Sequence, residues 1–282
     1  MLYVVWGSTY LGFRLGVGPG GGFEPFMMGA LRFLPSAAVL LVYALLTRQR
    51  TVLGRRELAV MALSGVVLWV GGNGLILIAS QYAASGYAAL MVATTPIWAA
   101  TFEALLDRKA PSPKLVAGLL LGLLGVVVLS VPKLSQSSQA SLLAVLLLAL
   151  APMLWSAGTL YYQRNQTRLE PVVVSAYQQL FGGLAFLLLS PLLGERWAMP
   201  TLQGWLALAY LIVFGSLLAY TSFILAVKLL PVSLVTTYAY VNPAVALFLG
   251  WLVLGEGIGA WTLAGAALVL IAVGIVFRAR RR

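Results

Sequence analysis

The sequence contains no cysteine, no histidine and only seven acidic residues. The absence of cysteine excludes disulfides and thiol chemistry. The absence of histidine removes the commonest proton carrier near neutral pH, and with it most hydrolytic mechanisms. The chain also has no phosphate-binding glycine loop and no zinc-ligand spacing. We therefore expect no enzyme activity, no cofactor and no bound metal.

Charge of either sign is scarce, because only 9% of the 282 residues are charged, against about a quarter in soluble domains. Hydrophobic residues make up 61%, in stretches that exceed the roughly 18 residues of a membrane-spanning helix. The stretches do not alternate polar with apolar residues, as barrel strands do. The composition predicts an all-α membrane protein. Ten transmembrane helices are expected at 2–18, 24–47, 57–79, 82–106, 112–131, 140–163, 171–193, 202–226, 230–254 and 259–278.

The spans fall into two matching halves. Trp6–Tyr10 in the first half corresponds to Trp155–Thr159 in the second, and Pro96 corresponds to Pro243, which lies 147 residues later. Because five spans is an odd number, the second copy must enter the membrane upside down. The sequence thus predicts two five-helix inverted repeats, at 1–131 and 140–278, an arrangement typical of transporters.

The net charge of +11 reflects topology rather than nucleic-acid binding. Fourteen of the eighteen Lys and Arg residues lie at the C-terminus or in the loops after spans 2, 4, 6 and 8, whereas the loops after spans 5 and 7 carry only Lys133 and Arg196. By the positive-inside rule, both termini are cytoplasmic. No cleavable signal peptide is expected, since Met1 leads directly into the first span. We expect a multi-pass protein of the bacterial inner membrane, with the bilayer and a small-molecule substrate as its partners.

Aromatic and polar residues gather in spans 1, 3, 4, 6, 8 and 9. They are the candidate substrate-binding residues: Trp6, Tyr10, Trp69, Asn73, Thr94, Trp98, Trp155, Thr159, Tyr220, Tyr238 and Asn242. For Trp6 and Trp155 the alternative is an anchor at the membrane interface. For Asn73 and Asn242 it is a hydrogen bond between helices.

Two prolines occupy equivalent positions in the halves. Pro96 and Pro243 each remove a backbone donor and free carbonyls one turn earlier. Helix breaks at matching positions point to a binding site, so both are candidate hinges. A packing kink is the alternative.

Charges inside the spans are few. Arg32 lies eight residues into span 2 and should face the protein interior, where it could receive a substrate carboxylate or pair with helix carbonyls, Gln178 or Gln179. Glu103 is the acid closest to mid-membrane, but it lies one turn from Asp107–Lys109, which favours a surface ion pair. The scarcity of buried acids weakens the case for obligate proton antiport.

Small-residue faces mark spans 5 and 10, which are otherwise bland. Gly118, Gly122 and Gly125 form one face, and Gly265, Val269 and Ala272 form the other. Small faces allow close helix packing, so these spans are a scaffold or a dimer contact. The chain is accordingly expected to be a monomer or a homodimer.

Three groups of residues occur in the same chain: Trp6–Tyr10 with Arg14 and Gly16, Leu31–Phe33, and the Pro243 helix leading to Leu254–Glu256. Together they resemble EamA-type proteins of the drug/metabolite transporter superfamily. The chain departs from this pattern in the first half, where Asp107–Lys109 replaces the Gly-Glu pair. The resemblance implies ten spans, a central cavity between the halves and alternating access. It also implies structural roles for Arg32 and Glu256.

We interpret the chain as an exporter of amino acids or related small metabolites. Aromatic walls suit apolar side chains, but they suit aromatic cations as well, so efflux of toxic or drug-like cations is the alternative. A membrane enzyme lacks catalytic residues here, a lipid-handling protein should show a lateral polar groove, and a non-transporting scaffold would not need the inverted repeat. The substrate, the coupling ion and the direction of transport stay open.

Overall fold

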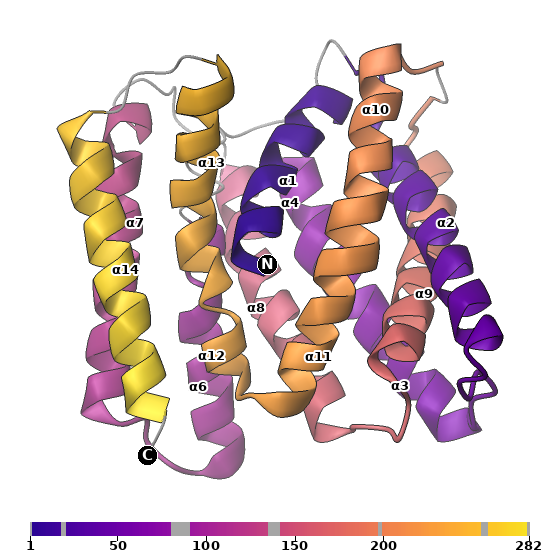
Figure 1. Ribbon diagram of the computed structural model, residues 1–282, viewed down its shortest axis with the longest axis horizontal. Coiled ribbons are helices and arrows are strands. Elements are labelled where there is room, and N and C mark those ends of the chain that lie inside the picture. The colour runs from indigo at the N-terminus through magenta and orange to yellow at the C-terminus, as the bar shows by residue number, and fades with distance from the viewer. Residues whose placement is uncertain are drawn as a thin grey trace.

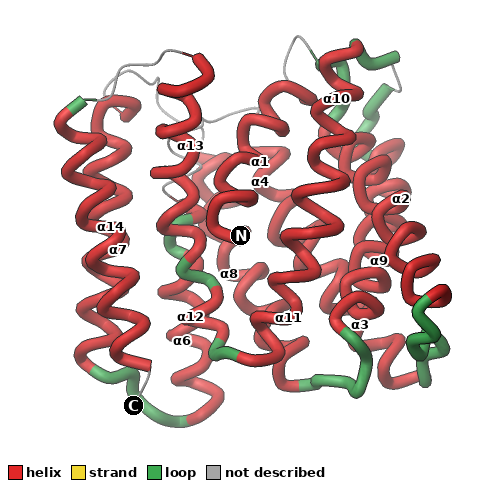
Figure 2. Tube along the Cα trace, viewed as in Figure 1, coloured by secondary structure: helices red, strands yellow, loops and turns green. Residues whose placement is uncertain are grey.

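The computed structural model describes residues 2–17, 21–79, 91–134, 142–196, 199–254 and 259–280. All the regular structure in these ranges is helical, as Figure 2 shows. The helices form one bundle with α7 and α14 at one side and α2 and α9 at the other (Figure 1). The all-helical fold expected from composition is confirmed.

Five helical stretches are described in the first half of the chain. They are α1 (Leu2–Val17), α2 (Pro25–Leu46), a continuous rod of α3 (Arg55–Val66), the π-helix η1 (Val67–Gly74) and α4 (Leu75–Ala79), then α6 (Thr95–Asp107) and α7 (Pro113–Leu134). The second half repeats this plan. It contains α8 (Leu142–Arg164), α9 (Pro171–Leu192), a rod of α10 (Leu202–Tyr210), the π-helix η2 (Leu211–Tyr220) and α11 (Thr221–Leu229), then α12 (Val232–Val235), α13 (Tyr238–Leu254) and α14 (Ala260–Arg280).

Five of the described helices are long and apolar enough to cross a membrane: Pro25–Leu46, Arg55–Ala79, Leu142–Arg164, Pro171–Leu192 and Leu202–Leu229. Among the other expected spans, those at 112–131 and 259–278 correspond to the continuous helices α7 and α14, and the one at 2–18 corresponds to α1. The expected span at 230–254 is broken at Thr236 and Thr237, between α12 and α13. The span expected at 82–106 is described only from residue 91, and a turn at Ala93 and Thr94 precedes α6.

The second helix of each half begins in the same way. Glu24 and Glu170 are extended N-cap residues, each followed by proline in the first helical turn, and each helix then runs for 22 residues. Proline is tolerated there because its missing N–H would lack an intrahelical partner anyway. This shared start aligns α2 with α9 at a separation of 146 residues, so Arg32 and Gln178 occupy equivalent positions.

Equivalent helices of the two halves pack against each other in opposite directions. On the α2–α9 pair, Gly29 faces Phe186 while Gly183 faces Leu34. On the α7–α14 pair, Gly118 faces Val276 while Gly125 faces Val269. Rising numbers on one helix meet falling numbers on the other, so both pairs are antiparallel. For α7 and α14 the two small faces meet within the chain, which is the scaffold arrangement expected for them.

The remaining contacts also repeat when the halves are exchanged. Helix α1 contacts α13, and its counterpart α8 contacts α6. Helix α8 packs on the α3–η1–α4 rod, and α1 packs on the α10–η2–α11 rod. These two sets of contacts therefore correspond to each other between the halves.

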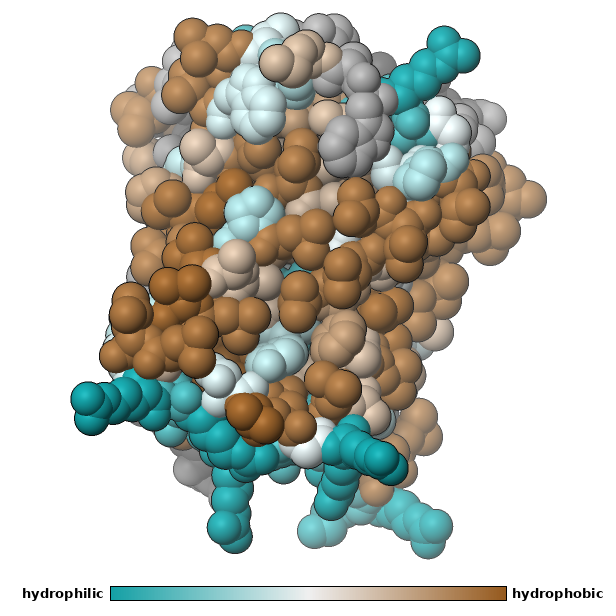
Figure 3. Space-filling model, turned by 90° about the vertical axis from the view of Figure 1, so that its right-hand side faces the viewer, coloured by the Kyte–Doolittle hydropathy of each residue, from teal (hydrophilic) through white to brown (hydrophobic). Residues whose placement is uncertain are grey.

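The outside of the bundle is apolar between charged ends. Figure 3 shows hydrophobic residues across the middle of the side that carries α2 and α9, with most of the hydrophilic residues at one end and fewer at the other. Exposed side chains on this side include Val39, Val42 and Leu45 of α2 and Leu188 of α9. Such a surface matches the acyl region of a bilayer.

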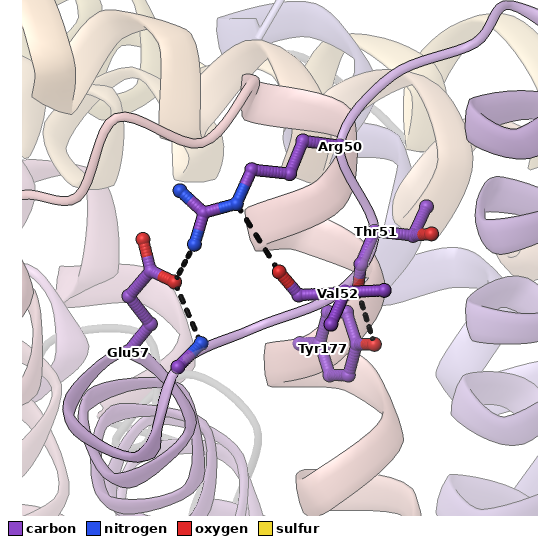
Figure 4. Close-up of polar contacts among 6 residues, drawn as sticks. Arg50, Thr51, Val52, Glu57 and Tyr177 are labelled. Atoms are coloured by element: carbon purple, nitrogen blue, oxygen red, sulfur yellow. Dashed lines mark hydrogen bonds and ion pairs between the residues drawn. The ribbon is translucent and has the colours of Figure 1, made fainter.

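The cation-rich loop between α2 and α3 is held in place by four polar contacts (Figure 4). Arg50 donates to Val52 O at 3.2 Å and forms an ion pair with Glu57, which also accepts from the amide of Gly54 at 2.9 Å. Tyr177 of α9 donates to Thr51 O at 2.8 Å. The loop is thus fastened to the other half of the chain.

Candidate functional site

A continuous aromatic cluster occupies the region where the two halves meet. The Trp6 ring lies 5.8 Å from the Trp155 ring and 4.5 Å from the Tyr238 ring. The Trp69 ring lies 5.7 Å from Trp155 and 4.5 Å from Tyr220. These five residues come from α1, η1, α8, η2 and α13, and each was a candidate on sequence grounds. Trp6 and Trp155, which begin the matching motifs, touch each other directly, and both are buried inside the protein instead of anchoring it at the interface.

Three phenylalanines that were not among the candidates complete the cluster. Phe223 bridges Trp6, Trp155 and Tyr220 at ring distances of 5.1, 5.7 and 5.8 Å. Phe33 packs on Trp69 at 4.0 Å and on Phe186 at 5.7 Å. Phe223 follows Tyr220 by one helical turn and Phe33 follows Arg32, so the spacing contained a signal for both.

Two π-helical segments carry central members of the cluster. Trp69 lies in η1 and Tyr220 ends η2. The 147-residue separation of Pro96 and Pro243 moves η1 onto 214–221, which overlaps η2. π-helical turns are rare and frequently lie at functional sites. The sequence had no clear signal for them beyond the glycines of Val70–Gly74 and at Gly215.

Arg32 of α2 is buried beside this cluster, with 3% of its surface exposed. Its Nε donates to Ser216 Oγ of η2 at 2.8 Å. Its guanidinium carbon lies 4.9 Å from the Phe33 ring centre, 5.2 Å from Phe13 and 6.0 Å from Trp69. The expected interior position is correct, but the hydrogen-bond partner is Ser216 and not Gln178 or Gln179.

Gln178, at the position equivalent to Arg32, has both of its polar side-chain atoms bonded to protein. Its amide nitrogen donates to Ser64 Oγ of α3 at 2.7 Å, and its carbonyl oxygen accepts from the Tyr220 hydroxyl at 2.7 Å. The neighbouring Gln179 donates to Ser175 Oγ at 2.9 Å and to Ser216 O at 3.4 Å.

Several buried polar atoms near the cluster have no hydrogen-bond partner within the described part of the chain. They are Trp69 Nε1, Trp155 Nε1, Gln179 Oε1 and Asn242 Oδ1. Buried polar atoms are nearly always bonded in folded proteins, so such a group needs an explanation. Two donors and two acceptors in one region fit a polar ligand that supplies the missing partners.

Other candidates lie apart from the cluster or have local roles. Trp98 is half-buried and lies 6.1 Å from Phe102, one turn along the same helix. The hydroxyls of Thr94 and Thr159 donate to the main-chain oxygens of Met91 and Trp155. Asn73 is half-buried on η1, and the side chain of Tyr10 is outside the described residues.

The two prolines differ in their surroundings. Pro96 lies in the first turn of α6, directly after the turn at Thr94, whereas Pro243 lies inside α13. The helix break in the second half therefore precedes its proline by six residues.

Glu103 differs from expectation. Its side chain is buried at 6% exposure, and its Oε1 accepts from the Ser233 amide of α12 at 3.2 Å. The predicted surface position is wrong for Glu103, because its side chain is buried; the neighbouring Asp107 forms an ion pair with Arg164 of α8.

Comparison with protein families decides the class of this molecule. The model of the EamA-like transporter family matches twice, over residues 1–131 and 142–278. The chain belongs to the EamA-like transporter family.

Curated relatives of this EamA chain are named as transporters. It is 34% identical to the "Uncharacterized inner membrane transporter YedA" of Escherichia coli strain K12, over 98% of this chain and 85% of the relative. It is 25% identical to the "Uncharacterized transporter YdfC" of Bacillus subtilis strain 168, over 89% of this chain and 80% of the relative. The chain therefore belongs to the multi-pass transporters of small molecules in the bacterial inner membrane.

A solved crystal structure has the same fold. It superposes with a TM-score of 0.83 at 22% identity and covers 100% of this chain and 95% of that one. At this identity the likeness concerns the fold alone.

Proposed function

We propose that this EamA chain exports amino acids or related small metabolites by alternating access, through ten spans arranged as two inverted five-helix repeats at 1–131 and 140–278. The antiparallel packing of α2 on α9 and of α7 on α14 supports the inversion. Equivalent helices of a pair related by a two-fold axis in the membrane plane run in opposite directions.

The orientation follows from the cations. The loops after α2, α6, α8 and α11 carry most of the Lys and Arg residues, and the C-terminus lies at one end of the bundle in Figure 1. We assign this end, and both termini, to the cytoplasm. Helix α1 then runs outward and α8 runs inward.

The observation that carries the proposal is the aromatic cluster at the meeting of the halves, with unpaired polar atoms around it. A core needed only for packing would not leave the indole nitrogens of Trp69 and Trp155 without partners. Aromatic rings offer apolar contacts, and a few polar groups fix the orientation of a ligand. The buried rings correspond to a closed arrangement that a bound substrate separates.

Switching between the two sides would use the helix breaks near Pro96 and Pro243. The turn at Thr94 and the break at Thr236 and Thr237 interrupt the fourth and ninth expected spans. Breaks in matching spans allow one end of a helix to move without the other. Both breaks border helices that pack on α1 and α8, which carry Trp6 and Trp155.

Uptake of a labelled amino-acid panel into proteoliposomes, with and without a pH gradient, tests the function. We expect saturable uptake without a gradient for at least one amino acid with an apolar or aromatic side chain, and loss of that uptake in Trp69→Ala. Trp261→Ala, which removes a 55%-exposed tryptophan on α14, is the matched control. Uptake in Trp69→Ala equal to that of wild type, with normal folding, would contradict the site.

Efflux of aromatic cations is the second candidate, since ring faces attract cations. Arg32 opposes it, because its guanidinium places a positive charge against Phe13, Phe33 and Trp69. Resistance to cationic dyes in cells that express the protein, without any amino-acid uptake, would favour efflux.

A further inference from the structure

The charge of Arg32 is buried and has no counter-ion among the described residues. The ion pairs found among the described residues are Arg50–Glu57 and Arg164–Asp107, and neither involves Arg32. The residue lies eight positions along the predicted span 2, or about 12 Å from its end at 1.5 Å per residue. A cation at such depth is expensive unless a partner neutralises it, and buried charges in membrane proteins commonly mark substrate paths. The three surrounding rings compensate part of this cost but carry no negative charge.

The hydrogen bond to Ser216 fixes the side chain and leaves its outer nitrogens available. Ser216 accepts from Nε, and within the described residues neither Nη group donates a hydrogen bond to protein. These two groups form the planar fork that binds a carboxylate through two parallel hydrogen bonds. Ser216 therefore holds the guanidinium in position, as a second group commonly does in a binding site.

Gly215 keeps space beside this fork. A Cβ at position 215 would lie 2.6 Å from Arg32 Nη2 and 3.2 Å from the Thr9 methyl group. Any side chain there would press on the guanidinium. The glycine belongs to η2, so the same π-helical segment supplies both the anchor for Nε and the space at Nη2.

Gln178, at the equivalent position in the second half, is an example of a polar residue that joins helices. Gln178 is neutral, and its two polar atoms are bonded to Ser64 and Tyr220. Arg32 carries a charge and has protein bonding at Nε alone within the described residues. If the position needed only to join helices, a residue bonded like Gln178 would serve in both halves. This difference in bonding between Arg32 and Gln178 is explained by a ligand that binds at Arg32.

An indole donor accompanies the fork. The Trp69 ring centre is 6.0 Å from the guanidinium carbon, and its Nε1 is buried without an acceptor in the described part of the chain. Among the described residues, the indole N–H is therefore a second unsatisfied donor in the neighbourhood of the guanidinium. The rest of the ligand would lie against the rings of the cluster.

We infer that Arg32 is the anion-binding group of the transport site, and that the site selects compounds carrying a carboxylate on an apolar or aromatic body. The inference rests on the proposed function, because it takes the aromatic cluster as the substrate site. It extends that proposal by naming the chemical group that is recognised and the residue that recognises it.

Ligand binding to the full-length protein in nanodiscs tests the inference through intrinsic tryptophan fluorescence. The probes are 3-phenylpropionate, its neutral amide 3-phenylpropionamide, and 2-phenylethylamine. They share the phenyl group and differ in the charged end. Wild-type protein should bind the acid at least tenfold more tightly than the amide and bind the amine weakest. One charge-assisted hydrogen bond lost is equivalent to about tenfold to a hundredfold in affinity.

Three variants locate the effect. Arg32→Gln should bind acid and amide equally. Gly215→Ala keeps the charge but pushes on Nη2, so it should weaken acid binding several-fold and leave amide binding unchanged. Arg56→Gln removes an exposed cation of α3 and should behave like wild type. If Arg32→Gln does not fold, the comparison of acid with amide on wild type and Gly215→Ala still decides the question.

The results separate this inference from the proposed function. Equal binding of acid and amide by wild type, or an acid preference that survives Arg32→Gln, overturns the role of Arg32 but leaves the aromatic site intact. If the acid does not bind while proteoliposomes transport cationic compounds, the anion site is likewise overturned. The protein would still be a transporter in that case. Absence of uptake for every compound tested would refute the proposed function itself.

Discussion

Two pairs of equivalent helices, α7–α14 and α2–α9, pack in the same way but differ in the polar residues that they carry. Both are antiparallel and both bring backbones together at glycines. The α7–α14 contact joins Gly118 and Gly125 to valines, and its outer faces expose Leu120 and Leu270. The α2–α9 pair instead carries Arg32 and Gln178 to the centre of the bundle. Close packing by small residues therefore identifies a helix pair, but only the polar residues on it distinguish a scaffold from a site.

The largest effect on stability is expected from Trp69→Ala, which alters the aromatic cluster at the centre of the bundle. Trp69 is 1% exposed and contacts Phe33, Trp155 and Tyr220, so its removal leaves a cavity. We expect a loss of about 3–5 kcal/mol in the free energy of unfolding, as for other buried tryptophans. Thermal unfolding in detergent measures it. Trp261→Ala, on the outer face of α14, should change stability little; equal losses in both variants would mean that the cluster is not a tight core.

Gly125→Leu disturbs the close packing of α7 on α14. A Cβ at this position would lie 2.9 Å from the main-chain nitrogen of Val269 and 3.1 Å from Gly265 O, and backbone atoms cannot move aside as a flexible side chain can. Overpacking should cost about 1–3 kcal/mol. The binding of 3-phenylpropionate by the folded fraction should not change. Gly274→Leu, on the same helix pair with no atom within 4 Å of the added Cβ, serves as the control.

Ser64→Ala and Ser216→Ala test the difference in role between Gln178 and Arg32. Ser64→Ala leaves the amide nitrogen of Gln178 without its acceptor and should cost about 1 kcal/mol, with ligand affinity unchanged. Ser216→Ala frees Arg32 Nε and should weaken acid binding several-fold. Melting temperature and the acid-to-amide affinity ratio are measured on both. A change of that ratio in Ser64→Ala alone would reverse our assignment of the two sides.

Glu195→Gln is expected to have the smallest effect. Glu195 follows α9 and accepts from the amides of Phe26 and Met27 at 2.7 and 2.8 Å, so it caps α2 and ties the pair together at one end. Loss of a negative charge at a helix N-terminus should lower stability by about 0.5–1 kcal/mol. Glu24→Gln is the control, because the Glu24 side chain makes no capping hydrogen bond. Comparable losses in the two variants would show that the general charge at this end matters and the specific cap does not.

Hydropathy predicted the layout of the helices well where the chain also carries end signals. The span expected at 171–193 is α9 at Pro171–Leu192, because proline after an extended residue fixes where the helix begins. The span at 230–254 was expected to be continuous, since it is rich in apolar residues and contains no charged residue. Its break at Thr236 and Thr237 depends on contacts that hydropathy does not contain.

The candidate site was foreseen in part. Trp6, Trp69, Trp155, Tyr220 and Tyr238 converge as expected from their positions in facing spans. Trp98 does not join them among the described contacts, and Ser216 was missed as the partner of Arg32. Helical spacing shows which residues share a face, but it does not show how far each helix is rotated toward its neighbours.

The sequence alone determined that this is a helical membrane protein of two similar halves, because apolar length and internal similarity are properties of the chain itself. It also identified the residue types from which a site could be built. Only the tertiary structure decided that Gln178 would be bonded to Ser64 and Tyr220, while the Nη groups of Arg32 make no hydrogen bond to the described residues. That outcome depends on how far each helix is rotated toward its neighbours and on the π-helical segments η1 and η2, in which Trp69 and Ser216 lie.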